Sequence, residues 1–279
     1  MLKFLLLIMI FMLLIFMTVA SIIPGSEQKT NPVADLGKEL VRPLTKVDSI
    51  GPGLSKTLDN MKLPSFSGGK KTEELDPHAL SDHTDAVFSN KDLPNVNFAG
   101  STLTTSQFDG ALLDEAILEG VAGKGVSFVK ARMEKANLNA AELPDADFSG
   151  AELSAATIRA GILPRAKFID SDISFVSFSG AQMQEADLRK SYSAGAIFIG
   201  ADLTGANFTG ADLTGVRFPH AQLKNADFNA ADLTLADLSG TNIHGANFSG
   251  AINLTQEQLA DACADANTKL PEGFTATRC

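Results

Sequence analysis

A period of five residues runs without interruption from Phe88 to Phe248. Of the 33 residues at this spacing, which we call the central residues, 31 are large and apolar; the exceptions are Gly123 and Ser193, where we expect a bulge or thinned packing. Two residues before each central residue stands Ala, Ser, Gly, Val or Thr, with Lys91 as the one bulky exception. A period of five fits neither the 3.6-residue α-helix nor the two-residue strand. It predicts a coil that turns a corner every five residues, with the large and small residues inside.

Four such sides close a coil of twenty residues, and the placement of Phe tests this closure. In the column formed by every fourth central residue from Phe88, eight of nine positions are Phe. The opposite column, which begins at Phe98, holds the other four central Phe, and the two columns between them hold none. Rings stacked at the ~4.8 Å spacing of neighbouring strands can pack offset inside such a coil. The 33 sides therefore predict a rod of about eight coils.

Individual blocks of this period have a recognisable form. ADLTG at 201–205 and ANFTG at 206–210 resemble the A(D/N)LXX motif of the pentapeptide repeat family. The resemblance covers residues 86–252 and implies an all-β solenoid, a right-handed quadrilateral β-helix. Some members of that family resemble B-form DNA and protect topoisomerases from quinolones.

The N-terminal part of the chain predicts a membrane segment and a linker. An apolar run that begins at Phe4 continues to Ile23, and as a helix it would be roughly 30 Å long, enough to span a bilayer. We therefore expect an N-terminal transmembrane helix at 1–23, with a cleaved signal peptide as the alternative. Residues 24–85 are rich in Pro and Gly, which predicts a linker and an N-terminal cap. The repeat domain would then be periplasmic or otherwise exported, and anchored by the N-terminus.

Residues 253–279 follow the last repeat and predict a cap for the open end of the solenoid. Thr255 and Gln258 have the spacing of a capping box. This motif predicts a C-terminal capping helix from Gln256 to about Asp265, with a stapled tail after it.

Cys263 and Cys279 are the only two cysteines, with fifteen residues between them. A disulfide that staples the tail in an oxidising compartment is the plainest use of such a pair, and two unrelated thiols are the alternative. No His stands near either cysteine along the chain, so we expect no metal site.

The sequence offers no constellation of catalytic groups. The four His occur singly, and none is placed to activate a nucleophile. The Gly-rich run at 120–125 lacks the spacing of a phosphate-binding loop. A net charge of −10 and a pI near 4.9 exclude adhesion to nucleic acid through clustered Lys and Arg. We therefore expect a protein that is not an enzyme, with no cofactor, no small-molecule substrate and no nucleic acid as a partner.

One outward column carries an acidic stripe, formed by Glu152, Asp172, Asp212 and Asp232. Carboxylates spaced along a rod can imitate a DNA backbone, but a solvated face is the more ordinary interpretation. Because core and membrane account for the Phe residues, we expect recognition to rest on outward polar and small residues. We expect a membrane-anchored scaffold whose partners are the membrane and an envelope or integral membrane protein complex. The alternative is a DNA mimic that binds or protects a type II topoisomerase.

Overall fold

The structure, a computed structural model, describes residues 81–279. The expected membrane helix at 1–23 and almost all of the expected linker at 24–85 lie outside the described residues. Within residues 81–279, no helix has both the length and the apolar character needed to span a bilayer.

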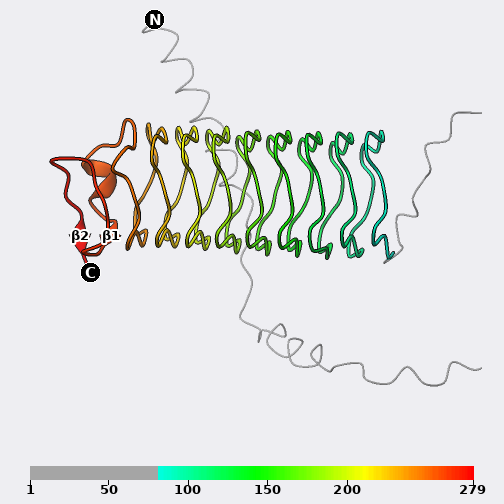
Figure 1. Cartoon of the computed structure of the whole chain (residues 1–279), viewed down its shortest axis with the longest axis horizontal. Coiled ribbons are helices and arrows are strands. Elements are labelled where there is room, and N and C mark those ends of the chain that lie inside the picture. Colours follow the sequence, from blue (N-terminus) through cyan, green and yellow to red (C-terminus); the bar gives the residue numbers. More distant parts are fainter. Residues whose placement is uncertain (1–80) are drawn as a thin grey trace, which may run out of the picture. The chain divides into compact units, whose positions relative to one another are not determined.

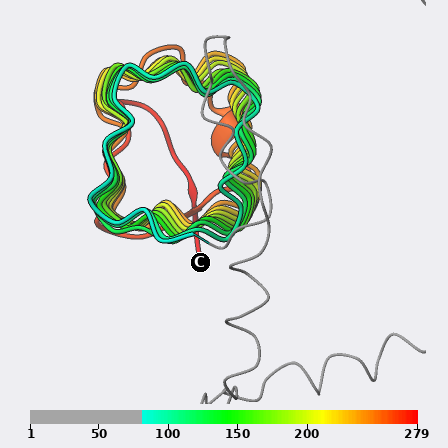
Figure 2. The same cartoon turned by 90° about the vertical axis from the view of Figure 1, so that its right-hand side faces the viewer.

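Residues 82–252 form a rod of stacked four-sided coils, seen from the side in Figure 1 and along the axis in Figure 2. Each side contributes one residue to a parallel bridge with the residue one coil later, from Asp82 with Thr102 to Asp232 with Ile252. Backbone hydrogen bonds of 2.6 to 3.4 Å accompany these bridges and the corners along the whole rod. The predicted quadrilateral β-helix is confirmed.

A tight turn joins each side to the next. The N–H three residues after a central residue donates to the carbonyl of that residue, as in Ala111 to Phe108 at 2.9 Å. The residue two places after the central one has a positive φ at every corner from residue 85 to 245. Gly adopts this conformation without steric cost, yet Phe175 and Leu235 hold φ values of 58° and 56° there. The period of five is therefore the distance between successive left-handed corners.

The Phe columns fill the core of the rod as stacked rings. Phe148 lies between Phe128 at 4.9 Å and Phe168 at 4.8 Å, with interplanar angles of 7° and 3°. Rings of the opposite column meet this stack edge to face, as between Phe168 and Phe178 at 5.6 Å and 84°. All four rings are fully buried. Offset and edge-to-face contacts are the arrangements that aromatic quadrupoles favour, and the central Phe residues on two opposite sides of the coil make both kinds of contact.

The bulge expected at the two small central residues is absent. Gly123 keeps its place in the ladder, because its N–H donates to Glu142 O at 2.8 Å. A Cβ at Gly123 would lie 2.6 Å from Cγ2 of Val126, so a neighbouring side chain already fills the space. Ser193 is fully buried, and its hydroxyl lies 2.8 Å from the hydroxyl of Ser191. At both small central residues, local side chains compensate for the missing bulk and the backbone keeps its regular path.

The C-terminal residues cap the rod without the predicted α-helix. A single 3-10 turn, η3 (Glu257–Leu259), is followed by β1 (Cys263–Ala264) and β2 (Thr277–Arg278), which pair in parallel. The capping box does form, because Thr255 N donates to Gln258 Oε1 at 2.7 Å. Figure 2 shows the last segment of the chain crossing the open end of the square coil.

The helix does not continue because the chain returns to the ladder of the last coil. Cys263 N donates to Thr241 O at 2.8 Å, and Ile243 N donates to Cys263 O at 2.8 Å. A helix through Cys263 would leave this edge of the coil unpaired, and an unsatisfied backbone group costs more than helix propensity contributes. The prediction of a capping helix to Asp265 is therefore wrong, although its first turn is present.

Candidate functional site

The four faces of the rod differ in charge. We define each face by the residue before its central residues and the two residues after them, counted from residue 82 to 245. The face whose central residues run from Leu93 to Leu233 holds eight acidic and two basic side chains, and we call it the acidic face. Of the other three faces, one holds five acids and four bases, one holds two acids and two bases, and one holds six acids and three bases. The acids of the acidic face are Asp92, Asp114, Glu115, Glu134, Glu152, Asp172, Asp212 and Asp232.

The two bases of the acidic face neutralise only its N-terminal half. Arg132 forms an ion pair with Asp114, with Nε donating to Oδ2 at 2.6 Å. Lys135 Nζ lies 4.0 Å from Glu115 Oε1. No cationic side chain within residues 81–279 forms an ion pair with the four acids that the sequence singled out, Glu152, Asp172, Asp212 and Asp232. The C-terminal half of the face is therefore uncompensated.

The ladder places these four acids in one line. Consecutive parallel bridges join Glu152 to Asp172, Asp172 to Tyr192, Tyr192 to Asp212, and Asp212 to Asp232. Adjacent bridges lie about 4.8 Å apart along the axis, the spacing of hydrogen-bonded strands. The predicted stripe is thus contiguous, with one aromatic residue in its middle.

Local hydrogen bonds orient three of the carboxylates over their own corners. Asp172 Oδ1 accepts a bond from the N–H two residues later at 2.9 Å, and Asp212 Oδ1 does the same at 3.0 Å. Asp232 Oδ1 accepts from the hydroxyl of Thr234 at 2.6 Å and from Asn253 Nδ2 at 3.0 Å. These two donors hold the pKa of Asp232 below its usual value of 3.8. Its charge is therefore fixed in position and retained in mild acid.

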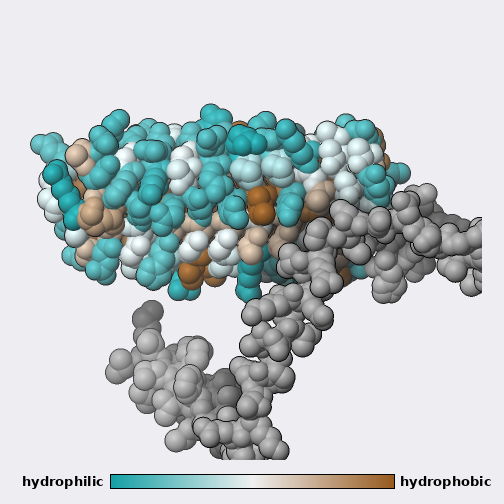
Figure 3. All heavy atoms as spheres, turned by 90° about the horizontal axis from the view of Figure 1, so that it is seen from below, coloured by the Kyte–Doolittle hydropathy of each residue, from teal (hydrophilic) through white to brown (hydrophobic). Residues whose placement is uncertain are grey.

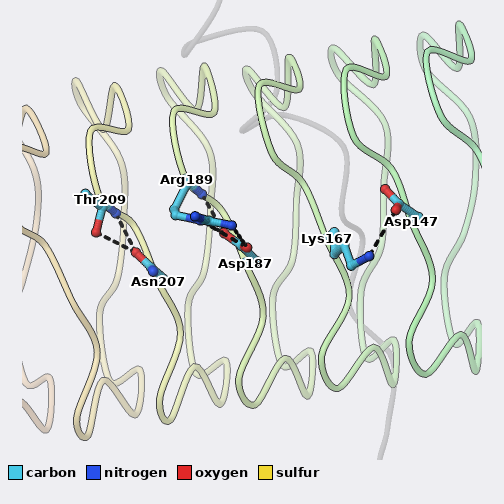
Figure 4. A network of polar contacts seen from close by, with 6 residues as sticks. All are labelled: Asp147, Lys167, Asp187, Arg189, Asn207 and Thr209. Atoms are coloured by element: carbon cyan, nitrogen blue, oxygen red, sulfur yellow. Dashed lines mark hydrogen bonds and ion pairs between the residues drawn. The ribbon is translucent and has the colours of Figure 1, made fainter.

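The neighbouring face shows the contrast at the same ladder positions (Figure 4). Asp147 lies 3.3 Å from Lys167 Nζ, which follows it one coil later. Asp187 pairs with Arg189, with Nη2 at 2.7 Å from Oδ2. Both faces carry aspartates at this position. On the neighbouring face Asp147 and Asp187 form ion pairs and Asp227 does not, whereas within residues 81–279 none of Asp172, Asp212 and Asp232 on the acidic face forms one.

Exposed apolar side chains accompany the acids. Tyr192, Phe175 and Leu235, all on the acidic face, are exposed by 61%, 67% and 82%. The ring of Phe175 lies across the corner at Gly195, where an added Cβ would come within 2.7 Å of the ring. In the view of Figure 3 the rod is mostly hydrophilic, with hydrophobic residues in small separate groups. The expectation that recognition rests on outward polar and small residues does not include these large apolar side chains.

The structure joins Cys263 and Cys279 in a disulfide, with Cα atoms 5.6 Å apart. His244 Nε2 lies 3.2 Å from Cys263 Sγ and 3.6 Å from Cys279 Sγ. The expectation that no His lies near the cysteines did not include His244, because it rested on neighbours along the chain only. His244 precedes Cys263 by nineteen residues, close to one full coil, so the period of the coil contained the signal.

Comparison with protein-family models matches the chain to one family, described as pentapeptide repeats, in eight copies. The matched segments are residues 84–120, 124–154, 151–189, 181–218 and 220–252. No curated protein matches the chain.

Solved structures of several pentapeptide repeat proteins are similar to this chain. A structure of QnrB1, a plasmid-mediated fluoroquinolone resistance protein, has 15% identity and a TM-score of 0.47, and the match covers 67% of this chain and 91% of that chain. HetL, involved in heterocyst differentiation regulation in the cyanobacterium Nostoc, has 22% identity and a TM-score of 0.27, with coverage of 70% and 86%. A protein of the Arabidopsis thaliana thylakoid lumen has 28% identity and a TM-score of 0.19, with coverage of 36% and 58%.

These comparisons correct the expected partners. We expected the membrane and a membrane protein complex as partners, with no nucleic acid and no small-molecule substrate. Three of the similar structures are forms of QnrB1, described as a plasmid-mediated fluoroquinolone resistance protein and not as a membrane protein. The prediction of membrane partners is wrong.

Proposed function

Because the chain belongs to the pentapeptide repeat family, we propose that its β-helix is a non-enzymatic binding rod. Its acidic face binds the DNA-binding surface of a protein, and the proposed class of partner is the type II topoisomerases. The rod acts there as a partial mimic of DNA.

The observation that carries this proposal is the concentration of uncompensated carboxylates on one face. The acidic face has six more acids than bases, whereas the other three have an excess of three acids or fewer. A one-sided charge steers a rod so that this face meets a cationic partner. DNA-binding surfaces are the cationic surfaces whose length and regularity suit a rod of stacked coils.

The charge density sets a limit on the mimicry. Over eight coils of about 4.8 Å, an excess of six charges is one per ~6 Å, whereas duplex DNA carries one per ~1.7 Å. Electrostatic attraction alone would therefore be weaker than that of DNA, and contacts of another kind must contribute to the affinity.

The exposed apolar residues of the acidic face supply such contacts. Phe175 and Leu235 occupy left-handed corners, where a side chain costs roughly 1–2 kcal/mol relative to Gly. Because both side chains are exposed, their burial in the free protein offsets little of this cost. Tyr192 stands between two aspartates of the stripe, and exposed aromatic residues are enriched at protein interfaces. In this proposal all three side chains are buried against the partner and contribute to the affinity.

The test measures binding of the full chain to a type II topoisomerase, in competition with duplex DNA. Replacing Asp172, Asp212 and Asp232 with Asn removes three charges and keeps the Oδ1 acceptors of the corner hydrogen bonds. We expect the affinity to fall on the order of tenfold or more, and the remaining binding to depend less on salt.

The neighbouring face provides the matched control. Asp147, Asp187 and Asp227 occupy the same ladder position, and the first two pair with Lys167 and Arg189. Changing all three to Asn removes the same charge from a face whose five acids and four bases nearly balance. This variant should bind within about twofold of the unchanged chain. Equal losses from both triple variants, or binding that duplex DNA does not displace, would contradict the proposal.

A further inference from the structure

The cap brings a third donor atom to the cysteine pair. Nε2 of His244 and the two sulfurs belong to a group of donor atoms that all lie within 4.8 Å of one another. Among the residues that the structure describes, no other set of three His, Cys, Asp or Glu forms such a group. We propose that, once the disulfide is reduced, His244, Cys263 and Cys279 bind a Zn²⁺ ion.

The imidazole already lies where a zinc ligand must lie. Zn–S bonds of about 2.3 Å and Zn–N bonds of about 2.0–2.1 Å at a tetrahedral angle place nitrogen and sulfur about 3.6 Å apart. His244 Nε2 is 3.2 Å from one sulfur and 3.6 Å from the other. Two sulfurs on the same ion would be about 3.8 Å apart. Reduction therefore has only to let the sulfurs separate, while the imidazole keeps its place.

Backbone hydrogen bonds position these ligands independently of the disulfide. Cys263 N donates to Thr241 O at 2.8 Å, which ties this ligand to the last coil. His244 O accepts from Asn225 N at 2.8 Å, which ties the second ligand to the coil before. Cys279 directly follows β2, which pairs with β1. The three side chains are thus preorganised, and little order has to be created when the ion binds.

The donor set selects the metal. Two thiolates and an imidazole are soft to borderline ligands, which suit Zn²⁺ and not Mg²⁺ or Ca²⁺. Three protein ligands leave the fourth tetrahedral position to water or to another ligand. A dithiol reductant supplies two electrons and two protons, which convert the disulfide to two thiols while the dithiol closes to its own disulfide. Zn²⁺ then replaces both thiol protons, which pass to solvent as the two Zn–S bonds form.

The consequence is a tail that stays joined to the last coil in either redox state. In oxidising conditions the disulfide holds β2 beside β1, and in reducing conditions the metal holds the same two chain segments. The cap therefore protects the edge of the last coil whichever side of a membrane the domain occupies.

The test titrates the full chain with Co²⁺, which reports zinc-like sites by its absorption. The chain is first reduced with a phosphine and kept without oxygen. We expect one equivalent to bind with the thiolate-to-cobalt band and the visible bands of tetrahedral coordination, and Zn²⁺ to displace it. His244→Ala should weaken binding at least about tenfold, and Cys279→Ser should remove most of the thiolate band. The exposed His220 gives the control, so His220→Ala should bind like the unchanged chain.

A second measurement does not depend on any variant folding. Zn²⁺ should slow the alkylation of both cysteines in the reduced, unchanged chain. Saturable Co²⁺ binding by the disulfide form, no binding by the reduced form, unchanged affinity in His244→Ala, or alkylation indifferent to Zn²⁺ would each overturn the proposal.

Discussion

At the scale of single residues, the stacked phenyl rings determine which side chains can be accommodated in the core columns. Inside a run of Phe, a stacked ring contacts the ring above and below it in its own column, as Phe148 contacts Phe128 and Phe168. Leu188 interrupts this column and is fully buried as well, so the column accepts an aliphatic residue when the volume is nearly kept.

Phe148→Ala should destabilise the rod by about 3–5 kcal/mol, because it removes a buried ring and leaves a cavity between two others. Phe148→Leu should cost about 1 kcal/mol, because Leu fills most of the same space. Denaturant unfolding of the two variants measures both values. Similar losses would show that aromatic stacking, and not volume, dominates this column.

The ion pair between Asp145 and Arg165 makes stability depend on pH. Arg165 donates to Asp145 through Nε at 2.6 Å and Nη2 at 3.0 Å, and this guanidinium holds the pKa of the carboxyl below its usual value of 3.8. A lowered folded-state pKa stabilises the fold above the unfolded-state pKa, and the contribution is lost as the pH falls through the folded-state value. We expect Arg165→Gln to lower the melting temperature at pH 7, and the difference from the unchanged chain to shrink below pH 4.

Arg217→Gln is the control for this measurement, since Arg217 is an exposed arginine on another face. The melting temperature of Arg217→Gln should differ little from that of the unchanged chain at both pH values. A difference for Arg165→Gln that stays constant down to pH 2 would exclude the carboxyl of Asp145 as its cause.

At the scale of elements, the cap shows what the sequence could and could not predict. The capping box of Thr255 and Gln258 correctly located the first turn, η3 (Glu257–Leu259). The end of that turn is set by the ladder, which takes Cys263 as its next partner. Such a partner lies a full coil away and leaves no local pattern, so local propensity favoured a longer helix.

Gln258 also closes the cap against the last coil. Its Nε2 donates to the carbonyls of Leu233 and Ala236, each at 2.8 Å. Gln258→Ala removes the donor of both bonds, at a local cost of about 1–3 kcal/mol. We expect amides between residues 254 and 264 to exchange with solvent about tenfold faster or more, while amides of the central coils stay unchanged. The exposed Gln182, changed to Ala, should alter neither region.

At the scale of the whole molecule, the repeat was predictable and the binding surface only in part. The four-sided coil and the core columns follow from the period, because a twenty-residue turn assigns every residue to a side. The stripe at Glu152, Asp172, Asp212 and Asp232 was predicted by the same register. The ion pairs that neutralise the other faces depend on side-chain conformations, which no period contains. The register does place Phe175 at an outward corner, two residues after the central Ile173, so its exposure could be predicted from the sequence.

The membrane anchor at 1–23 stays a prediction, because it lies outside the described residues. Reporters that work only inside or only outside the cytoplasm, fused to the C-terminus, measure the side on which the rod lies. An active inside reporter is the result that the proposed topoisomerase contact requires. An active outside reporter would contradict that contact and leave the metal site untouched.

Because a left-handed corner recurs at every fifth residue, the position of a residue along the chain determines the side of the rod on which it lies. Removing twenty residues would shorten the rod by one coil and keep every column in line. Removing one block of five, such as 156–160, would leave an unbroken repeat but turn everything after it by a quarter revolution. The aspartates at 172, 212 and 232 would then continue a different side from Glu152. Among all insertions and deletions that preserve the fold, only whole coils preserve the direction in which the surface faces.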